Sequence, residues 1–485
     1  MQIEEVVAAE AAVGALDPVQ ALLGDQDRVI DVLNVLRLKQ TPPIRHRLST
    51  LEPTPHCRPR SINTSVLAAR SRYNNSMVLK VTVSPELIEG SVDEGYGKVA
   101  DAFRANFAAG REVGAAVAVY RDGAKVVDLW GGYRNGVTKT PWHHDTVVNM
   151  YSTTKGIASL AVAVAASRGL ISYDAKVAEY WPEFAQAGKA EVTVRQLLSH
   201  QAGLPALDAP LRLADLTDLT ILSAVLAAQA PAWLPGTRHG YHALTLGWYE
   251  SELIRHADPA ARTLGRFFAD EVAAPLNLDL YIGLPASVDR DRVAHLHGWP
   301  RAEALLHLNT MPTRFAMSLL NPFSLGSKSV NIPNDVDVMK DFNSDEVRRV
   351  EMPAANGIGT ARSVAKAYGC AATGGSELGL TPGTLEALTQ SAVEPSGGVR
   401  DRVLHVDSAF SLGYCKPVPH FRFGSTDKAF GTPGYGGSFG FADPDTGVGF
   451  GYVMNRLGFH LWSDPRELAL RQALFRDVLG VRSQA

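Results

Sequence analysis

The chain has 485 residues, of which 46% are hydrophobic and 20% are charged, and its formal net charge at pH 7 is −3. This is the composition of a globular protein with enough chain for a large core and more than one structural lobe. So small a net charge excludes both a strong basic field for nucleic acid and an acidic interaction tail.

The first part of the chain differs in texture from the rest. Residues 1–77 mix Pro, Arg, Ser and Thr without sustained periodicity, which is typical of a loosely ordered N-terminal extension. Residues 95–110 then predict an amphipathic helix, whose apolar face comprises Val99, Phe103 and Phe107. Residues 114–133 predict two strands around a turn at Asp122-Gly123.

The later elements complete the pattern. A long apolar helix is expected over residues 149–169, and a short one over residues 193–205. Residues 205–350 are mostly helical in pattern, with proline-rich turns. Strands return at residues 434–456, and residues 465–480 close the chain as a helix. Strands at both ends with helices between them predict an α+β fold, in which a helical lobe interrupts a sheet.

The helix at residues 149–169 raises a chemical question. Its first turn holds Ser152, and Lys155 stands three residues later, so both lie on one helical face. A buried lysine loses its charge readily and could take the proton of the serine. The alternative interpretation is that serine, threonine and lysine simply cap the helix.

The Ser-x-x-Lys pattern itself is not specific, because it occurs three times in the chain, as Ser152/Lys155, Ser363/Lys366 and Ser425/Lys428. The second pair opens an exposed helix pattern, where Ser363 fits a cap or a first-turn residue. The third pair lies in a polar loop before a strand. Ser152 differs because the helix that it opens is nearly uncharged and must be buried.

A competing nucleophile motif is Gly436-Gly-Ser438-Phe-Gly440, which matches the Gly-x-Ser-x-Gly elbow of α/β-hydrolases. That elbow requires a helix after the serine, whereas a turn and another strand pattern follow here. His460 is also the one histidine downstream that could complete a triad. We therefore expect these glycines to allow a close approach of two backbones instead.

Five segments in order carry a family resemblance: "DTVVNMYSTTKG", "VTVRQLLSHQAGLP", "LPGTRHGYHALTLGW", "ANGIGTARSVAKAYG" and "GTPGYGGSFGFADPDTGVGFGYVMNR". From about residue 83 to about residue 480 the chain resembles the serine β-lactamase and penicillin-binding-protein superfamily. Within that superfamily it is most similar to the β-lactamase-like carboxylesterases called family VIII. The resemblance implies one β-lactamase-like domain over residues 83–480, with an antiparallel sheet flanked by helices and a helical lobe at about 205–350.

The resemblance also implies roles for individual residues. Ser152 would be the acylated nucleophile, and Lys155 and Tyr241 would transfer protons as a pair. Lys155 would supply the cation that a tyrosine of ordinary pKa needs before it can act as a base. The backbone N–H groups of Ser152 and Tyr435 would form the oxyanion hole.

Two departures from the family pattern concern substrate binding. Ala243 stands where lactamases have an asparagine that holds the substrate amide, and Thr432 stands where relatives have a cation. Gly434 and Gly436 complete the expected substrate-contacting edge strand. Because both losses affect groups that grip an amide or a carboxylate, the sequence favours short, uncharged esters as substrates.

The functional prediction is a cofactor-free serine hydrolase that acts on a small-molecule ester. On the same site a β-lactamase, a D-amino-acid peptidase or an acyltransferase is an open alternative, as is a non-catalytic sensor or binding protein. Three scattered cysteines indicate neither a disulfide framework nor a metal site. The N-terminus lacks a basic n-region and the longest apolar run is too short for a bilayer, so we expect a cytoplasmic protein without a membrane span. The oligomeric state stays open.

Overall fold

The computed structural model describes residues 79, 81–299, 303 and 307–481. The expected extension over residues 1–77 lies outside the described residues. Among the residues that are described, no helix is both long and apolar enough to cross a membrane.

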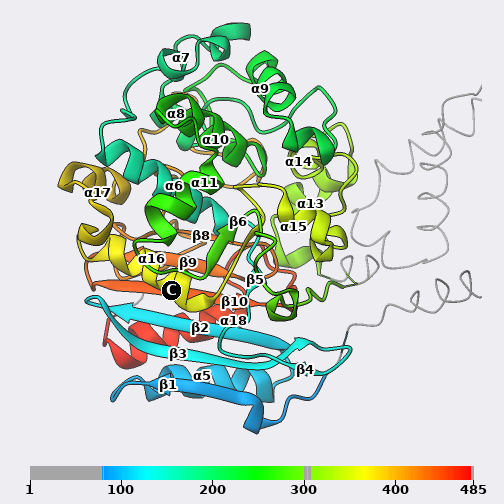
Figure 1. Cartoon of the computed structure of the whole chain (residues 1–485), viewed down its shortest axis with the longest axis vertical. Helices are drawn as coiled ribbons and strands as arrows, with labels where there is room; N and C mark the ends of the chain where they lie inside the picture. Colours follow the sequence, from blue (N-terminus) through cyan, green and yellow to red (C-terminus); the bar gives the residue numbers. More distant parts are fainter. Residues whose placement is uncertain (1–78, 80, 300–302, 304–306, 482–485) are drawn as a thin grey trace, which may run out of the picture. The chain divides into compact units, whose positions relative to one another are not determined.

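A seven-stranded sheet is the base of the fold, with the strand order β1-β3-β2-β10-β9-β8 and with β4 paired to β3 (Figure 1). All of these pairings are antiparallel, as predicted. The strands are β1 (Ile88–Val92), β2 (Gly114–Arg121), β3 (Ala124–Asn135), β4 (Thr140–Pro141), β8 (Phe430–Pro433), β9 (Phe439–Asp443) and β10 (Val448–Met454).

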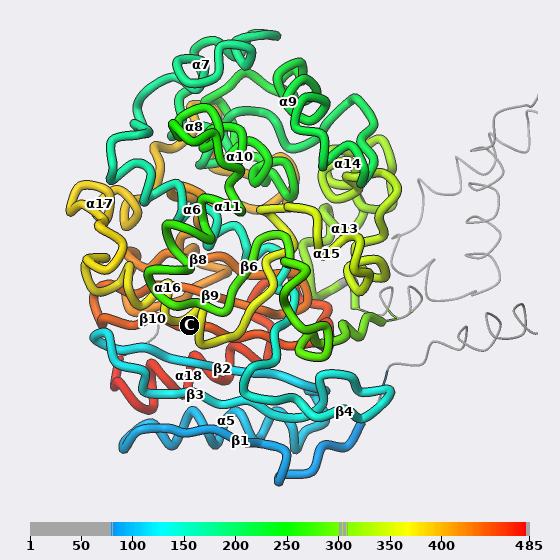
Figure 2. Tube along the Cα trace, viewed as in Figure 1, coloured from blue at the N-terminus to red at the C-terminus, as the bar shows by residue number. Residues whose placement is uncertain are grey.

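The sheet joins segments that are far apart in the sequence. The predicted hairpin of β2 and β3 turns at Asp122 and Gly123, both with positive φ. β10 then pairs with β2 across more than 300 residues, with Phe450 opposite Val119. Figure 2 shows the cyan strand β2 beside the orange-red strand β10.

The two faces of the sheet differ because glycines alternate with aromatic residues along β9 and β10. A side chain at Gly449 or Gly451 would collide with the backbone of α16 (Ala361–Ala372), so these glycines let that helix lie directly on the strands. The opposite face carries Phe439 and Phe441, which contact α18 and η10. Strand alternation thus fixes which helices cover which face.

Helices surround the sheet on both sides (Figure 1). The predicted amphipathic helix is α5 (Gly97–Ala108), whose residues Val99, Phe103 and Phe107 are buried as expected. It packs beside the predicted C-terminal helix, which is α18 (Pro465–Gln472) continued by the π-helix η10 (Ala473–Val478). The other helices are α6 (Thr153–Ser167), α7 (Val177–Tyr180), α8 (Val194–Leu198), α9 (Leu219–Ala228), α10 (Thr245–Ala257), α11 (Leu264–Phe268), α13 (Thr313–Leu320), α14 (Leu325–Val330), α15 (Asp345–Arg349) and α17 (Pro382–Thr389).

The predicted helical segment at 205–350 contains helices but also a strand that the sequence pattern did not indicate. This strand, β6 (Leu280–Ile282), pairs with β7 (Gly357–Gly359), and β7 pairs with β5 (Val148–Asn149). The small sheet holds the chain immediately before the start of α6. The bounds of a separate helical lobe stay a prediction.

Candidate active site

Ser152 lies at the start of α6, and its side chain does not cap the helix. The helix forms because residues 153–167 are rich in Ala and Val, and Thr153 through Ala165 are all buried. The hydroxyl of Ser152 accepts a hydrogen bond of 3.1 Å from Nζ of Lys155. The contact predicted from the three-residue spacing is therefore present, and the capping interpretation of Ser152 is wrong.

The residue before the serine is held in an unfavourable backbone conformation. Tyr151 has φ = +45°, a left-handed value that costs free energy for a bulky residue. Its hydroxyl donates to the carbonyl of Val338 at 2.9 Å, and its carbonyl accepts from Thr154 Oγ1 at 2.5 Å. Met150 is tied to Gly357 of β7 by a backbone hydrogen bond of 2.9 Å. These contacts hold Ser152 at a sharp turn between strand and helix.

Lys155 is completely buried, and burial disfavours the charged form of its amine. Besides Ser152, its Nζ donates to the carbonyls of Ala243, at 2.6 Å, and Ala354, at 2.9 Å. Burial lowers the pKa of Lys155 to about 7, against a smaller opposing effect from the carboxylate of Glu250. An amine with this pKa can accept a proton from Ser152 near neutral pH.

Tyr241 completes the group, because it contacts both Ser152 and Lys155. Its hydroxyl is hydrogen-bonded to Ser152, and Nζ of Lys155 lies 4.9 Å from the centre of its ring. Burial raises the pKa of Tyr241 well above 10, so the phenol keeps its proton at neutral pH. The expectation that a cationic Lys155 makes Tyr241 the base is therefore not favoured. In the neutral form, the two hydrogens of Nζ serve the carbonyls of Ala243 and Ala354, which leaves the lone pair for the proton of Ser152, with the phenol of Tyr241 adjacent.

Two buried carboxylates near this group were not identified from the sequence. Asp401 accepts hydrogen bonds from the backbone N–H groups of Tyr241 (2.9 Å), Val403 (2.7 Å) and Leu404 (2.8 Å). Burial raises the pKa of Asp401 to about 6. The pattern Asp-x-x-Leu could have suggested a turn at Asp401, but nothing in it indicates Tyr241, which is 160 residues away.

Glu250, on α10, lies beneath the helix that carries the serine. Its Oε1 accepts a hydrogen bond of 2.7 Å from Ser159, one turn after Lys155 on α6. Burial raises the pKa of Glu250 to about 8, so the carboxyl is mostly protonated at neutral pH, and only its ionised form favours the protonated form of Lys155. The available sequence signal was a pair of acidic residues, Glu250 and Glu252, in this helix pattern, but it does not reveal the partner.

The competing serines are occupied by structural contacts. Ser438 is 1% exposed, donates to the carbonyl of Met150 at 2.8 Å, and lies 3.1 Å from the hydroxyl of Thr153. A strand follows it, as the sequence indicated, so the elbow interpretation is excluded. Ser363 lies in the first turn of α16 and accepts from Asp279 N, and Ser425 donates to Asp443. Ser438 thus anchors the turn that holds Ser152.

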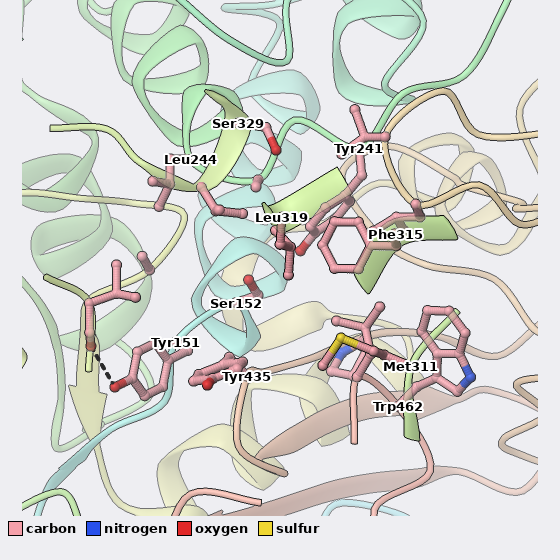
Figure 3. A pocket seen from close by; sticks show the side chains of 18 of the residues that line it. Tyr151, Ser152, Tyr241, Leu244, Met311, Phe315, Leu319, Ser329, Tyr435 and Trp462 are labelled. Atoms are coloured by element: carbon pink, nitrogen blue, oxygen red, sulfur yellow. Dashed lines mark hydrogen bonds between the residues drawn. The ribbon is translucent and has the colours of Figure 1, made fainter. Parts of the chain in front are cut away.

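A cavity of about 720 Å³ opens at Ser152. Figure 3 shows Tyr151 and Tyr435 on one side of the serine and Tyr241, Phe315, Met311 and Trp462 on the other. Most of the lining is apolar or aromatic. The charged residues among the described lining residues are three aspartates, at 335, 337 and 341, and Lys416, whose Nζ donates to the carbonyl of Thr389 at 2.5 Å.

Some of the residues predicted to lie at the substrate line the cavity, and others do not. Ala243 and Tyr435 line the cavity. Thr432 does not, contrary to the sequence-based expectation, because its side chain is 1% exposed and faces Tyr368 of α16. The next residue of β8, Pro433, lines the cavity in its place, since successive strand residues point to opposite sides.

The two glycines of this segment shape its backbone. A side chain at Gly434 would collide with Ser438 and with the carbonyl of Met150, so the glycine allows β8 to approach the start of α6. Gly436 has φ = +86°, and its carbonyl accepts from the buried Arg466 at 2.6 Å. Neither glycine lines the cavity, but together they set the backbone around Tyr435.

Comparisons with known proteins identify the family and the fold of the chain. The family model described as Beta-lactamase matches residues 99–474. The esterase/beta-lactamase LipL of Mycobacterium tuberculosis is 37% identical over 369 residues, which cover 76% of this chain and 83% of LipL. The crystal structure of a family VIII carboxylesterase is 39% identical, with a TM-score of 0.68 over 80% of this chain and 99% of the other. A penicillin-binding protein homologue from Caulobacter crescentus is 38% identical, with a TM-score of 0.70 and the same coverage.

Proposed function

Since the chain belongs to the beta-lactamase family and is a serine hydrolase, we propose that it cleaves carboxylic esters through an acyl-enzyme formed on Ser152. The observation that carries the proposal is the contact of Ser152 with a buried lysine whose pKa is about 7. The relatives described as esterase and carboxylesterase favour a catalytic protein over the non-catalytic binding protein that the sequence left open.

In the first half of the reaction, Oγ of Ser152 attacks the ester carbonyl carbon while neutral Lys155 accepts its proton. The new C–O bond forms as the carbonyl π-bond opens, and the backbone N–H groups of Ser152 and Tyr435 stabilise the resulting oxyanion. The tetrahedral intermediate then collapses and the bond to the alcohol oxygen breaks. Tyr241 donates its proton to the leaving oxygen and is reprotonated from Lys155, so the alcohol departs neutral.

In the second half, water replaces the alcohol and the proton transfers run the same route. Lys155 takes a proton from water through Tyr241, and the hydroxide attacks the acyl carbon. The bond to Oγ then breaks, the acid is released, and Ser152 regains its proton. With the ester and one water molecule as reactants, the three side chains carry out every proton transfer, and the two N–H groups hold the oxyanion.

The lining of the cavity supports esters over carboxylate-bearing lactams. Pro433 and Tyr435 offer no positive charge where a substrate would lie along β8. The three aspartates of the lining would repel a substrate carboxylate. Lys416 is directed at the carbonyl of Thr389, and burial lowers its pKa to about 7. A hydrogen bond between a cationic side chain and the substrate carboxylate, which this lining does not offer, would contribute about 1.5–3 kcal/mol.

Labelling with a fluorophosphonate, followed by mass spectrometry of the peptides, tests the proposal directly. We expect one phosphonylated residue, Ser152, and loss of the label in Ser152→Ala. Hydrolysis of p-nitrophenyl butyrate should disappear in the same variant. A label on another serine, or esterase activity that survives Ser152→Ala, would refute the assignment.

A further inference from the structure

The cavity has two walls that belong to different hydrophobic clusters. One wall, which we call the tyrosine wall, contains Tyr151, Tyr435, Phe342 and Val338 and is continuous with the main core. The other is built around a separate small cluster and packs against Tyr241. This second wall, the Phe315 wall, consists of Met311, Phe315, Leu319, Val403 and Leu404, and Trp462, which packs against both clusters, lies where the two meet.

Ser152 lies between the two walls, and Tyr241 lies on the side of the Phe315 wall (Figure 3). The carboxylate of Asp401 joins Tyr241 to that wall, because it accepts from the backbone of Tyr241 and from Val403 and Leu404. Tyr241 and the wall beside it are therefore one positioned unit.

The direction of proton transfer determines which part of the ester faces which wall of the cavity. Tyr241 must reach the oxygen of the leaving alcohol, so the alcohol part of the ester lies on the side of Tyr241. The carbonyl oxygen points to the N–H groups of Ser152 and Tyr435. The remaining substituent of the tetrahedral carbon, the acyl chain, then extends towards the tyrosine wall.

Resting on the proposed function, we propose that the Phe315 wall is the binding site for the alcohol part of the substrate, and that the natural substrates are esters of bulky apolar alcohols. The separate apolar cluster beside Tyr241 offers contacts to an alkyl or ring-bearing alcohol. The whole cavity, at about 720 Å³, is in the range that encloses drug-sized ligands and is far larger than a short ester requires. The preference for short acyl chains expected from the sequence then concerns the other side of the ester bond.

Two series of alkyl esters separate the two sides. In one series the acid is always acetate and the alcohol grows from ethanol to butanol, hexanol and octanol. In the other the alcohol is always ethanol and the acid grows by the same steps. The leaving alcohols have similar acidity, so chain length changes contacts rather than chemistry. We expect kcat/KM to rise about fourfold per methylene along the alcohol series until the wall is filled, the equivalent of about 0.8 kcal/mol per buried CH₂. The acid series should rise much less.

Two substitutions on one helix test the place of binding. Leu319 of α13 lines the cavity, while its neighbour Leu320 is 59% exposed and does not line it. Leu319→Trp should cut the ratio of kcat/KM for hexyl acetate over ethyl acetate at least tenfold, because the indole fills the space. Leu320→Trp, the matched control, should keep the ratio of the unchanged protein. Val338→Trp, on the tyrosine wall, should instead lower the rate for the longer ethyl esters. The fluorophosphonate labelling rate shows that each variant is folded.

The outcomes separate this inference from the proposed function. If kcat/KM rose along the acid series instead, and Leu319→Trp lowered the rates of that series, the acyl chain would lie at the Phe315 wall. That result would overturn the inference. Rates independent of length in both series would overturn it as well, as would a labelled Ser152 with no turnover of any alkyl ester. Absence of labelling at Ser152 would overturn the proposed function itself.

Discussion

The rate of acylation should follow the titration of Lys155. Burial holds its pKa at about 7 instead of 10.5, and the protonated amine cannot accept the proton of Ser152. The active form is therefore lost as the pH falls through 7. We expect kcat/KM to be constant above about pH 8, about tenfold lower at pH 6 and about a hundredfold lower at pH 5. Ethyl ester hydrolysis in a pH-stat between pH 5 and 9 measures this, with circular dichroism at each pH to show that the fold is intact.

Two variants identify the titrating group. Glu250→Gln removes a carboxyl whose ionised form favours the protonated lysine, but burial raises the pKa of Glu250 to about 8, so little of that charge is present near pH 7 and the inflection should move only slightly to lower pH. Lys416 also lines the cavity with a pKa of about 7, and Lys416→Met should leave the inflection in place. A shift in Lys416→Met but not in Glu250→Gln would assign the titration to Lys416. An inflection near pH 10, or a rate independent of pH from 5 to 8, would refute the role of a desolvated Lys155.

Other predictions follow from individual contacts. Ser152→Ala should abolish ester hydrolysis, while Ser438→Ala, which removes the tether to the Met150 carbonyl, should retain much of kcat; the reverse result would contradict the fold assignment. Lys155→Ala and Tyr241→Phe should each lower kcat by roughly 10²–10⁴, and the double variant should lose little more, because the two act as one proton-transfer unit; additive losses would show independent roles. Asp401→Asn should lower kcat more than it changes KM, since it loosens Tyr241, and an unchanged kcat would show that Tyr241 is held without it. p-Nitrophenyl butyrate should exceed nitrocefin in kcat/KM on the same preparation, and a preference for nitrocefin would show that the lining does not repel carboxylates as argued.

The sequence predicted the parts of this fold that depend on local pattern. The two strands around the Asp122-Gly123 turn and the spacing of Val99, Phe103 and Phe107 follow from local sequence pattern alone, and the structure confirms them. The site could be placed at Ser152 and Lys155 because i and i+3 residues meet on a helix and because an uncharged helix must be buried.

The remaining parts depend on contacts between distant segments. The strand pairing of β5, β6 and β7 and the bond from Asp401 to Tyr241 are carried by residues whose local sequence contains no trace of the partner. The error at Thr432 has a simpler origin. A one-residue step along a strand exchanges the buried side for the exposed side, and the motif alone does not say which residue of Thr432-Pro433 faces the substrate.

The surroundings of Lys155 couple chemistry to folding. Its three acceptors come from separate places in the chain: Ser152, the carbonyl of Ala243 and the carbonyl of Ala354. The amine is stripped of water while these segments enclose it. If one of them moves away, water reaches Nζ, the pKa returns towards 10.5 and the amine becomes a cation at neutral pH. In a newly made or partly opened chain, Ser152 then lacks a neutral base and is a poor nucleophile. Ser152 becomes reactive only when the tertiary structure is complete and Lys155 is buried.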